Sequence, residues 1–122
     1  MKILCAVPFY NEKNNLIKLV EGLNDNYKLL NSSFDFIFID DGSDDGSSNI
    51  IKQYKVINNK KNLGYGKTIK IALDYGISHN YNYLSVMPGD YQRKFSDLIK
   101  LKNELVRNTP CDLINGSKLH IK

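Results

Sequence analysis

The chain has 122 residues, of which 42% are apolar and 25% charged, and this suits one soluble globular domain. Its formal net charge of +4 would suit an anionic partner, but the lysines are scattered as on an ordinary solvated surface, and no further feature indicates nucleic acid. No apolar run approaches the roughly 20 residues that span a bilayer, and Cys5 and Cys111 form no CxxC pair, so we expect two buried free thiols in a reducing cytoplasm rather than a zinc or redox site.

The first third of the chain predicts a strand, a helix and a second strand. Residues 3–7 form an apolar run, expected to be a buried strand that ends at Pro8. Asn11 is the expected N-cap of the helix, with Glu12 in its first turn. Residues 34–39 form the second strand. The predicted buried face of the helix repeats at helical spacing and comprises Leu16, Leu19, Val20, Leu23, Tyr27 and Leu30.

The middle of the chain predicts shorter elements. Residues 47–54 suggest a weak, short helix, residues 56–57 a minimal third strand, and residues 62–66 a turn rich in glycine. A further helix follows, because apolar or small residues again recur at i, i+3, i+4 and i+7: Ile69, Ala72, Leu73 and Gly76.

The last third repeats the alternation. Residues 83–87 predict a fourth strand, ended by Pro88 and Gly89. Ser96 is the expected cap of a fourth helix, and residues 112–115 predict a fifth strand. The apolar face of that helix comprises Leu98, Leu101 and Leu105.

The order βαβαβαβαβ predicts one α/β domain over residues 1–122, with a Rossmann-like, open and mainly parallel sheet and helices on both faces. In such sheets ligands bind beyond the carboxyl ends of the strands. The unusual polar residues fall at those ends, which favours a single site: Asn11, Glu12, Asp40, Asp41, Asp90 and Gln92.

The polar residues allow two interpretations each. Asp40 and Asp41 would be costly inside a core, so one of them could accept hydrogen bonds from a ligand at the mouth of the site, or both could simply cap the turn into the next helix. Asp90 and Gln92 offer hard oxygen ligands suited to Mg²⁺ or Mn²⁺, or they could belong to an ordinary polar loop.

Two familiar phosphate motifs fail. Gly66-Lys67-Thr68 resembles the end of a P-loop, but that motif needs glycine where Lys61 stands. A dinucleotide fingerprint beginning at Gly64 would need glycine where Ile69 stands, and it would follow the first strand rather than the third.

Five short motifs taken together resemble family 2 glycosyltransferases of GT-A fold, especially the branch that includes dolichol-phosphate mannose synthase. Each is weak alone, but they occur in the family's order and spacing over essentially the whole chain. The motifs lie at residues 7–12, 39–43, 62–66, 88–92 and 115–118.

The resemblance implies a role for each motif. Pro8, Tyr10 and Glu12 would line a nucleoside pocket, Asp41 would accept from the nucleoside, and Asp40 would hold the loop. Asp90 and Gln92 would bind a divalent metal, Mg or Mn, that bridges the donor pyrophosphate. The substrate-binding residues implied in this way are Pro8, Tyr10, Glu12, Ile39, Asp41, Gly64, Gly66, Gly89, Asp90 and Lys118.

The chain departs from the family pattern at three points. Pro88 replaces the first Asp of the usual Asp-x-Asp metal motif, and Lys118 replaces an Arg, which keeps the charge but loses the bidentate fork. Relatives also continue for about as long again, so the domain is expected to be incomplete at its C-terminus, without the acceptor half. We expect a cytoplasmic protein, peripheral at most on the membrane face, that self-associates or pairs with a partner chain.

The implied reaction is inverting transfer from a nucleotide-diphosphate sugar to a lipid phosphate or a saccharide. The catalytic residue is unknown, and whether this chain alone is an enzyme stays open. One alternative is a non-catalytic nucleotide-binding module or subunit. Another is a flavodoxin-like regulator, which would need an Asp at the end of the third strand, where Asn58 stands.

Overall fold

The computed structural model describes residues 3–30, 33–89, 98–100, 102–103 and 113–115. Strands and helices alternate along the chain as predicted, and residues 98–100 and 102–103 are helical too. The elements are β1 (Ile3–Phe9), α1 (Lys13–Asp25), α2 (Tyr27–Leu30), β2 (Phe34–Asp40), the 3-10 helix η1 (Ser47–Ile51), β3 (Lys55–Asn58), α3 (Tyr65–Ser78), β4 (Tyr83–Val86) and β5 (Leu113–Asn115).

The strands form one five-stranded sheet in the order β3-β2-β1-β4-β5, and every neighbouring pair is parallel. This confirms the predicted open α/β sheet. The order is that of a Rossmann-type half-sheet, whereas a flavodoxin-like sheet has the order 2-1-3-4-5. The flavodoxin-like alternative is therefore wrong at the level of topology.

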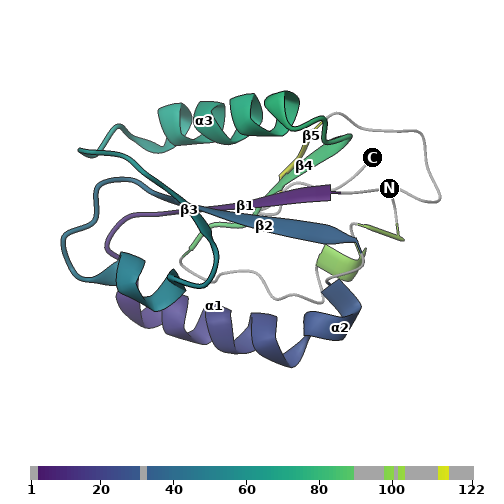
Figure 1. The fold of residues 1–122 in the computed structure, drawn as a ribbon, viewed down its shortest axis with the longest axis horizontal. Coiled ribbons are helices and arrows are strands. Elements are labelled where there is room, and N and C mark those ends of the chain that lie inside the picture. The colour runs from purple at the N-terminus through teal and green to yellow at the C-terminus, as the bar shows by residue number, and fades with distance from the viewer. Residues whose placement is uncertain (1–2, 31–32, 90–97, 101, 104–112, 116–122) are drawn as a thin grey trace.

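Helices cover both faces of the sheet, as predicted. In Figure 1, α3 lies along one face, while α1, α2 and η1 lie along the other. Because β1 is the central strand, its side chains alternate between the two layers. Cys5 and Val7 belong to the cluster on the α1 side, whereas Leu4 and Ala6 belong to the cluster on the α3 side.

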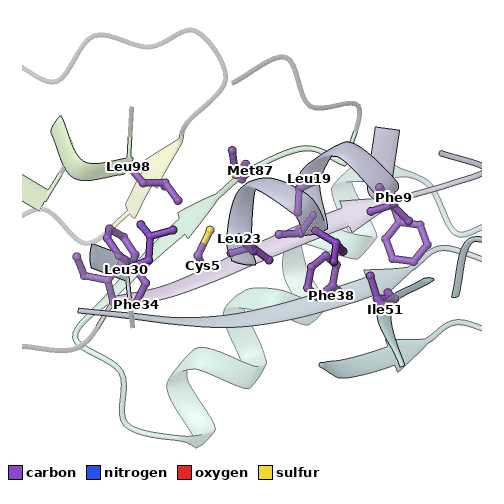
Figure 2. Packing of buried hydrophobic residues seen from close by; sticks show 14 residues of the cluster. Cys5, Phe9, Leu19, Leu23, Leu30, Phe34, Phe38, Ile51, Met87 and Leu98 are labelled. Atoms are coloured by element: carbon purple, nitrogen blue, oxygen red, sulfur yellow. The ribbon is translucent and has the colours of Figure 1, made fainter. Parts of the chain in front are cut away.

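The larger core cluster lies between the sheet and α1. Figure 2 shows Leu19 and Leu23 of α1 packed toward Phe38 of β2 and Cys5 of β1. The predicted buried face of α1 is confirmed at Leu16, Leu19, Val20 and Leu23. Cys5 is a free, buried thiol, and burial raises its pKa, so it is a packing residue; Cys111 lies outside the described residues.

The first strand does not end at Pro8 as predicted, because β1 continues one residue further. The Pro8 carbonyl accepts a hydrogen bond from the Gly89 N–H (2.9 Å), so position 8 faces the β4 side. Regular pairing with β4 has already ended there, at Ala6 and Val86. The missing proline N–H therefore interrupts no regular ladder bond, and a proline is tolerated in a central strand.

The buried face of the first helix does not extend to Tyr27, whose side chain is 61% exposed. The helix ends at Asp25, and the side-chain amide of the next residue, Asn26, donates to the Gly22 carbonyl (2.8 Å). A separate helical turn, α2, then brings Leu30 into the core.

The third helix begins at Tyr65, inside the segment predicted to be a turn. Its predicted buried face is confirmed at Ala72 and Gly76, and Ile69 is partly buried against the core, whereas Leu73 was wrongly included. Leu73 is 40% exposed, and the buried residues are Thr68, Ala72 and Gly76. Thr68 can be buried because its hydroxyl donates to the Gly64 carbonyl (2.9 Å).

Candidate functional site

The carboxyl ends of four strands are joined by backbone hydrogen bonds beyond the strands themselves. The Asp41 N–H, which follows β2, donates to the Phe9 carbonyl at the end of β1 (2.9 Å). The Asn59 N–H donates to the Asp40 carbonyl (2.8 Å), and the Gly89 N–H donates to the Pro8 carbonyl (2.9 Å). The loops that carry the predicted site residues therefore start from fixed positions at one edge of the sheet.

The turn between β1 and α1 differs from its prediction. Asn11 is not the N-cap of α1; Glu12 occupies that position and makes no capping bond with its side chain. The carboxylate of Asp45, from the loop after β2, instead accepts from the N–H of Lys13 (3.3 Å). The N-terminus of α1 is thus capped from another loop, a long-range contact that no local sequence pattern reveals.

Asp40 and Asp41 have different structural roles. Asp40 Oδ1 accepts from the Ser43 N–H (2.7 Å), so Asp40 holds its own turn, as expected. Asp41 reaches across to the loop before α3. Its Oδ1 accepts from the Asn59 side chain (2.9 Å) and the Leu63 N–H (2.8 Å), and its Oδ2 accepts from the N–H of Gly64 (3.0 Å).

The Asp41 carboxylate is buried, with 5% of the residue exposed. Burial by itself would raise the pKa of Asp41, but the hydrogen bonds, led by that from Leu63, outweigh it and hold the pKa below its ordinary value. Gly64 is the N-cap of α3, so the carboxylate also lies near the positive end of that helix dipole. Asp41 is therefore ionised at neutral pH.

Two glycines permit the close approach of these loops. A Cβ on Gly42 would lie 2.7 Å from backbone atoms of Lys61 and Asn62, and Gly42 has a φ of +85°. A Cβ on Gly89 would lie 2.6 Å from that of Phe9. Neither position has room for a side chain, so the loop after β2 and the turn after β4 can close on the edge only with glycine.

These segments line an open cavity of about 560 Å³. The strand order reverses between β1 and β4, and the cavity lies beside the ends of those two strands, where ligands bind in open α/β sheets. Its volume falls within the roughly 300–1,000 Å³ of small-molecule sites. The lining residues are Pro8, Phe9, Tyr10, Glu12, Asp41, Asn62, Gly64, Tyr65, Thr68, Pro88 and Gly89.

Most of the predicted site residues in the described part of the chain line this one cavity, which brings together segments far apart in the sequence. Ile39 instead packs in the core on the α3 side, and Gly66 lies exposed in the first turn of α3. Asp90, Gln92 and Lys118 lie outside the described residues. The predicted residues that line the cavity are Pro8, Tyr10, Glu12, Asp41, Gly64 and Gly89.

Five cavity residues were not among the predicted site residues: Phe9, Asn62, Tyr65, Thr68 and Pro88. A weak signal existed for Thr68, since Thr68, Ala72 and Gly76 are small residues spaced by four along a helix. The other four lie inside the motifs at residues 7–12, 62–66 and 88–92, which were the signal that could have found them.

The described residues do not by themselves form a metal site, because no three His, Cys, Asp or Glu side chains among them are gathered to hold an ion. Of the carboxylates that line the cavity, Asp41 is engaged by three donors, and Glu12 accepts from the side chain of Asn15 (2.7 Å). The residues predicted to bind the metal lie beyond Gly89.

The model of glycosyl transferase family 2 matches residues 5–116, which includes every segment that lines the cavity. The chain belongs to this family. The predicted resemblance is therefore confirmed.

This family 2 chain is similar to three curated proteins. It is 32% identical over 123 residues to an uncharacterized protein of Methanocaldococcus jannaschii, covering 93% of this chain and 51% of that protein. It is 27% identical to the undecaprenyl-phosphate 4-deoxy-4-formamido-L-arabinose transferase of Proteus mirabilis, covering 89% of this chain and 30% of that protein. It is 28% identical to a dolichyl-phosphate beta-glucosyltransferase of Trichomonas vaginalis, covering 92% of this chain and 38% of that protein.

The family 2 chain thus spans about half, or less, of the length of the curated relatives that it matches. None of the helices that the structure describes combines the length and apolar character needed to span a bilayer.

Proposed function

We propose that this domain binds a nucleotide-diphosphate sugar in the cavity and serves inverting transfer of the sugar to a lipid phosphate or a saccharide. The observation that carries the proposal is the cavity itself. A 560 Å³ space at the topological switch point is lined by four of the motifs that resemble the family. The names of the Proteus and Trichomonas relatives, both lipid-phosphate transferases, favour a lipid phosphate acceptor.

The lining suits a nucleoside at one end of the donor. Tyr10 and Tyr65 are 46% and 53% exposed, so each offers part of an aromatic ring to a base. Asp41 is ionised and lines the cavity, and we propose that its carboxylate accepts from a nucleoside N–H. The pocket thus supplies an apolar wall and one fixed acceptor, the combination that orients a small ligand.

A divalent ion, Mg²⁺ or Mn²⁺, is the proposed cofactor, and Asp90 and Gln92 are its proposed ligands on the strength of the motif alone. Such an ion would neutralise charge on the departing diphosphate. Gly89, the last residue before these two, lines the cavity, so a ligand there would lie at the correct edge. Lys118 is proposed to approach the donor phosphates.

A second candidate function is a nucleotide-binding module that needs a partner chain to become a transferase. It is favoured by Pro88, which lines the cavity where the family motif has its first Asp. A lipid phosphate acceptor is already ionised and needs no general base, whereas a hydroxyl acceptor does. Turnover assays with each acceptor class, compared with nucleotide binding, separate a transferase from a binding module.

The experiment is calorimetry with UDP, GDP, CDP and ADP, each with and without Mn²⁺. We expect one base to bind more tightly than the rest, and Asp90→Asn to abolish the gain from Mn²⁺ while leaving the fold intact. Asp44→Asn is the matched control, because it removes one exposed carboxylate from the same edge. Equal Mn²⁺ dependence in wild type and Asp90→Asn would overturn the metal assignment, and no binding of any nucleotide would overturn the function.

A further inference from the structure

The turn that follows β1 contains an unusual backbone conformation at Asn11, whose φ is +50°. Left-handed backbone is unfavourable for residues with a Cβ, and asparagine is among the few that adopt it readily. Asn11 lies between Tyr10 and Glu12, which both line the cavity. The backbone at position 11 therefore sets how its two neighbours are presented to the site.

Asn11 is held by bonds to the loop that follows β2. Its N–H donates to Ser43 Oγ (2.9 Å), and its side-chain Oδ1 accepts from the Asp44 N–H (3.0 Å). One residue further along, the Asp45 carboxylate caps α1 through the Lys13 N–H. These contacts join segments 32 and 33 residues apart, so they belong to the tertiary structure and not to a local turn.

The loop held in this way is also the one that carries Asp41. Ser43, which accepts from Asn11, donates its own N–H to Asp40, so the contact extends to the base of the Asp41 loop. Asp41 in turn holds the loop before α3. A displacement at Asn11 would therefore disturb three sides of the cavity rather than one.

We infer that Asn11 is a positioning residue for the site. Its left-handed backbone and its side-chain carbonyl together hold Tyr10 and Glu12 in register with Asp41 before any ligand arrives. The inference rests on the proposed function where it concerns nucleotide affinity, but the contact itself can be tested without a ligand. Asn11 serves the ligand only through its neighbours.

Three variants separate the two properties of Asn11. Asn11→Asp keeps an acceptor oxygen and tolerates the left-handed backbone. Asn11→Gly keeps the backbone freedom but loses the acceptor, and Asn11→Ala loses both. The matched control is Asn80→Ala, because Asn80 has a similar φ of +61° but follows α3 at the opposite edge of the sheet.

The first measurement is amide hydrogen exchange of the full chain without ligand. We expect Asn11→Ala and Asn11→Gly to speed exchange at the Asp44 N–H about tenfold or more, because its acceptor is lost, and Asn11→Asp to restore protection. Unchanged exchange at Asp44 in both Asn11→Ala and Asn11→Gly would overturn the inference. Should Asn11→Ala fail to fold, Asn11→Gly against Asn11→Asp still decides it.

The second measurement is the affinity for the nucleoside diphosphate that binds wild type best, at high ionic strength to screen the charge added by Asn11→Asp. If the competent arrangement falls to about a tenth of the population, the affinity falls about tenfold. We expect that loss for Asn11→Ala, a smaller loss for Asn11→Gly, and near wild-type affinity for Asn11→Asp.

Asn80→Ala separates positioning from mere stability. It should lower the melting temperature with unchanged nucleotide affinity, and equal losses of affinity in Asn11→Ala and Asn80→Ala would contradict a positioning role. If wild type binds no nucleoside diphosphate, the proposed function fails, whereas the exchange at Asp44 still decides whether Asn11 holds the turn.

Discussion

At the scale of a single residue, Asp41 combines a structural and a binding role. Three donors depend on its carboxylate: the Asn59 side chain and the N–H groups of Leu63 and Gly64. We predict that Asp41→Ala destabilises the fold by about 1–3 kcal/mol, because these part-buried donors lose their acceptor. Urea denaturation measures the loss, with Asp44→Ala as the control.

The same variant tests the proposed nucleoside contact. We expect Asp41→Ala to weaken nucleoside monophosphate binding even without metal, and calorimetry well below the melting temperature measures this. Lower stability with unchanged affinity would show that Asp41 only holds the loop.

The pKa of Asp41 gives a pH dependence with a definite sign. Its folded-state pKa lies below the ordinary value of 3.8, so the folded state favours the ionised form. The stabilisation is complete above the unfolded value and is lost as the pH falls through the folded value. We predict that the unfolding free energy of wild type falls more steeply below about pH 4 than that of Asp41→Asn. Parallel pH profiles of the two proteins would contradict it.

At the scale of the elements, the loop after β2 must pass close to the loop after β3. Gly42 and Gly46 have nearly the same φ, +85° and +84°, but only Gly42 is crowded; the nearest atom to a Cβ on Gly46 is 3.8 Å away. We predict that Gly46→Ala costs about 1–2 kcal/mol, the strain of left-handed backbone. Gly42→Ala should cost more and also weaken nucleotide binding, because it displaces residues 61–62. Thermal denaturation and calorimetry measure the two effects, and equal costs would refute the role of close packing.

In the N-terminal turn of α3, replacing a glycine by alanine should stabilise the chain rather than destabilise it. A Cβ on Gly66 meets no atom within 4 Å and its φ is not positive, so Gly66→Ala should stabilise the chain by up to about 1 kcal/mol. If the donor approaches this turn closely, as the resemblance implies, the same variant should bind nucleotide more weakly. Higher stability with unchanged affinity would remove Gly66 from the site.

At the scale of the whole molecule, we predict that the 122-residue chain binds nucleotide but transfers sugar poorly on its own. Transfer needs donor and acceptor held in line, and such positioning supplies about 7–11 kcal/mol of the barrier. Apart from Thr68, the residues that line the described cavity belong to motifs that the resemblance assigns to the donor side. A radiolabelled transfer assay with lipid-phosphate and saccharide acceptors, on a verified monomer, measures turnover. Robust transfer by that monomer would contradict the prediction.

A second prediction at this scale concerns association. Leu73 and Ile77, one turn apart on α3, are 40% and 67% exposed. Exposed apolar surface favours association, so Ile77→Lys should lower any concentration-dependent self-association seen by analytical ultracentrifugation. Lys70→Ala, on the same helix, is the control.

The sequence by itself determined the α/β class, the alternation of strands and helices, and the edge at which the polar residues collect. These follow from local periodicity and from the geometry of parallel strands, which every residue pattern of this kind shares. The sequence was also sufficient to identify the family, because the five motifs occur in the order typical of its members. It left the metal, the nucleotide and the acceptor as proposals.

Only the tertiary structure decided how the loops hold one another. No local pattern shows that Asp45 caps α1, that Asp41 anchors the loop before α3, or that Asn11 bonds to Asp44 instead of capping its own helix. The buried face of α3 was predicted at Ala72 and Gly76 but not at Thr68, which is polar in sequence and satisfies its hydroxyl within the helix. Hydrogen bonds between segments tens of residues apart depend on where the sheet places those segments. The spacing of residues along the chain does not predict that placement.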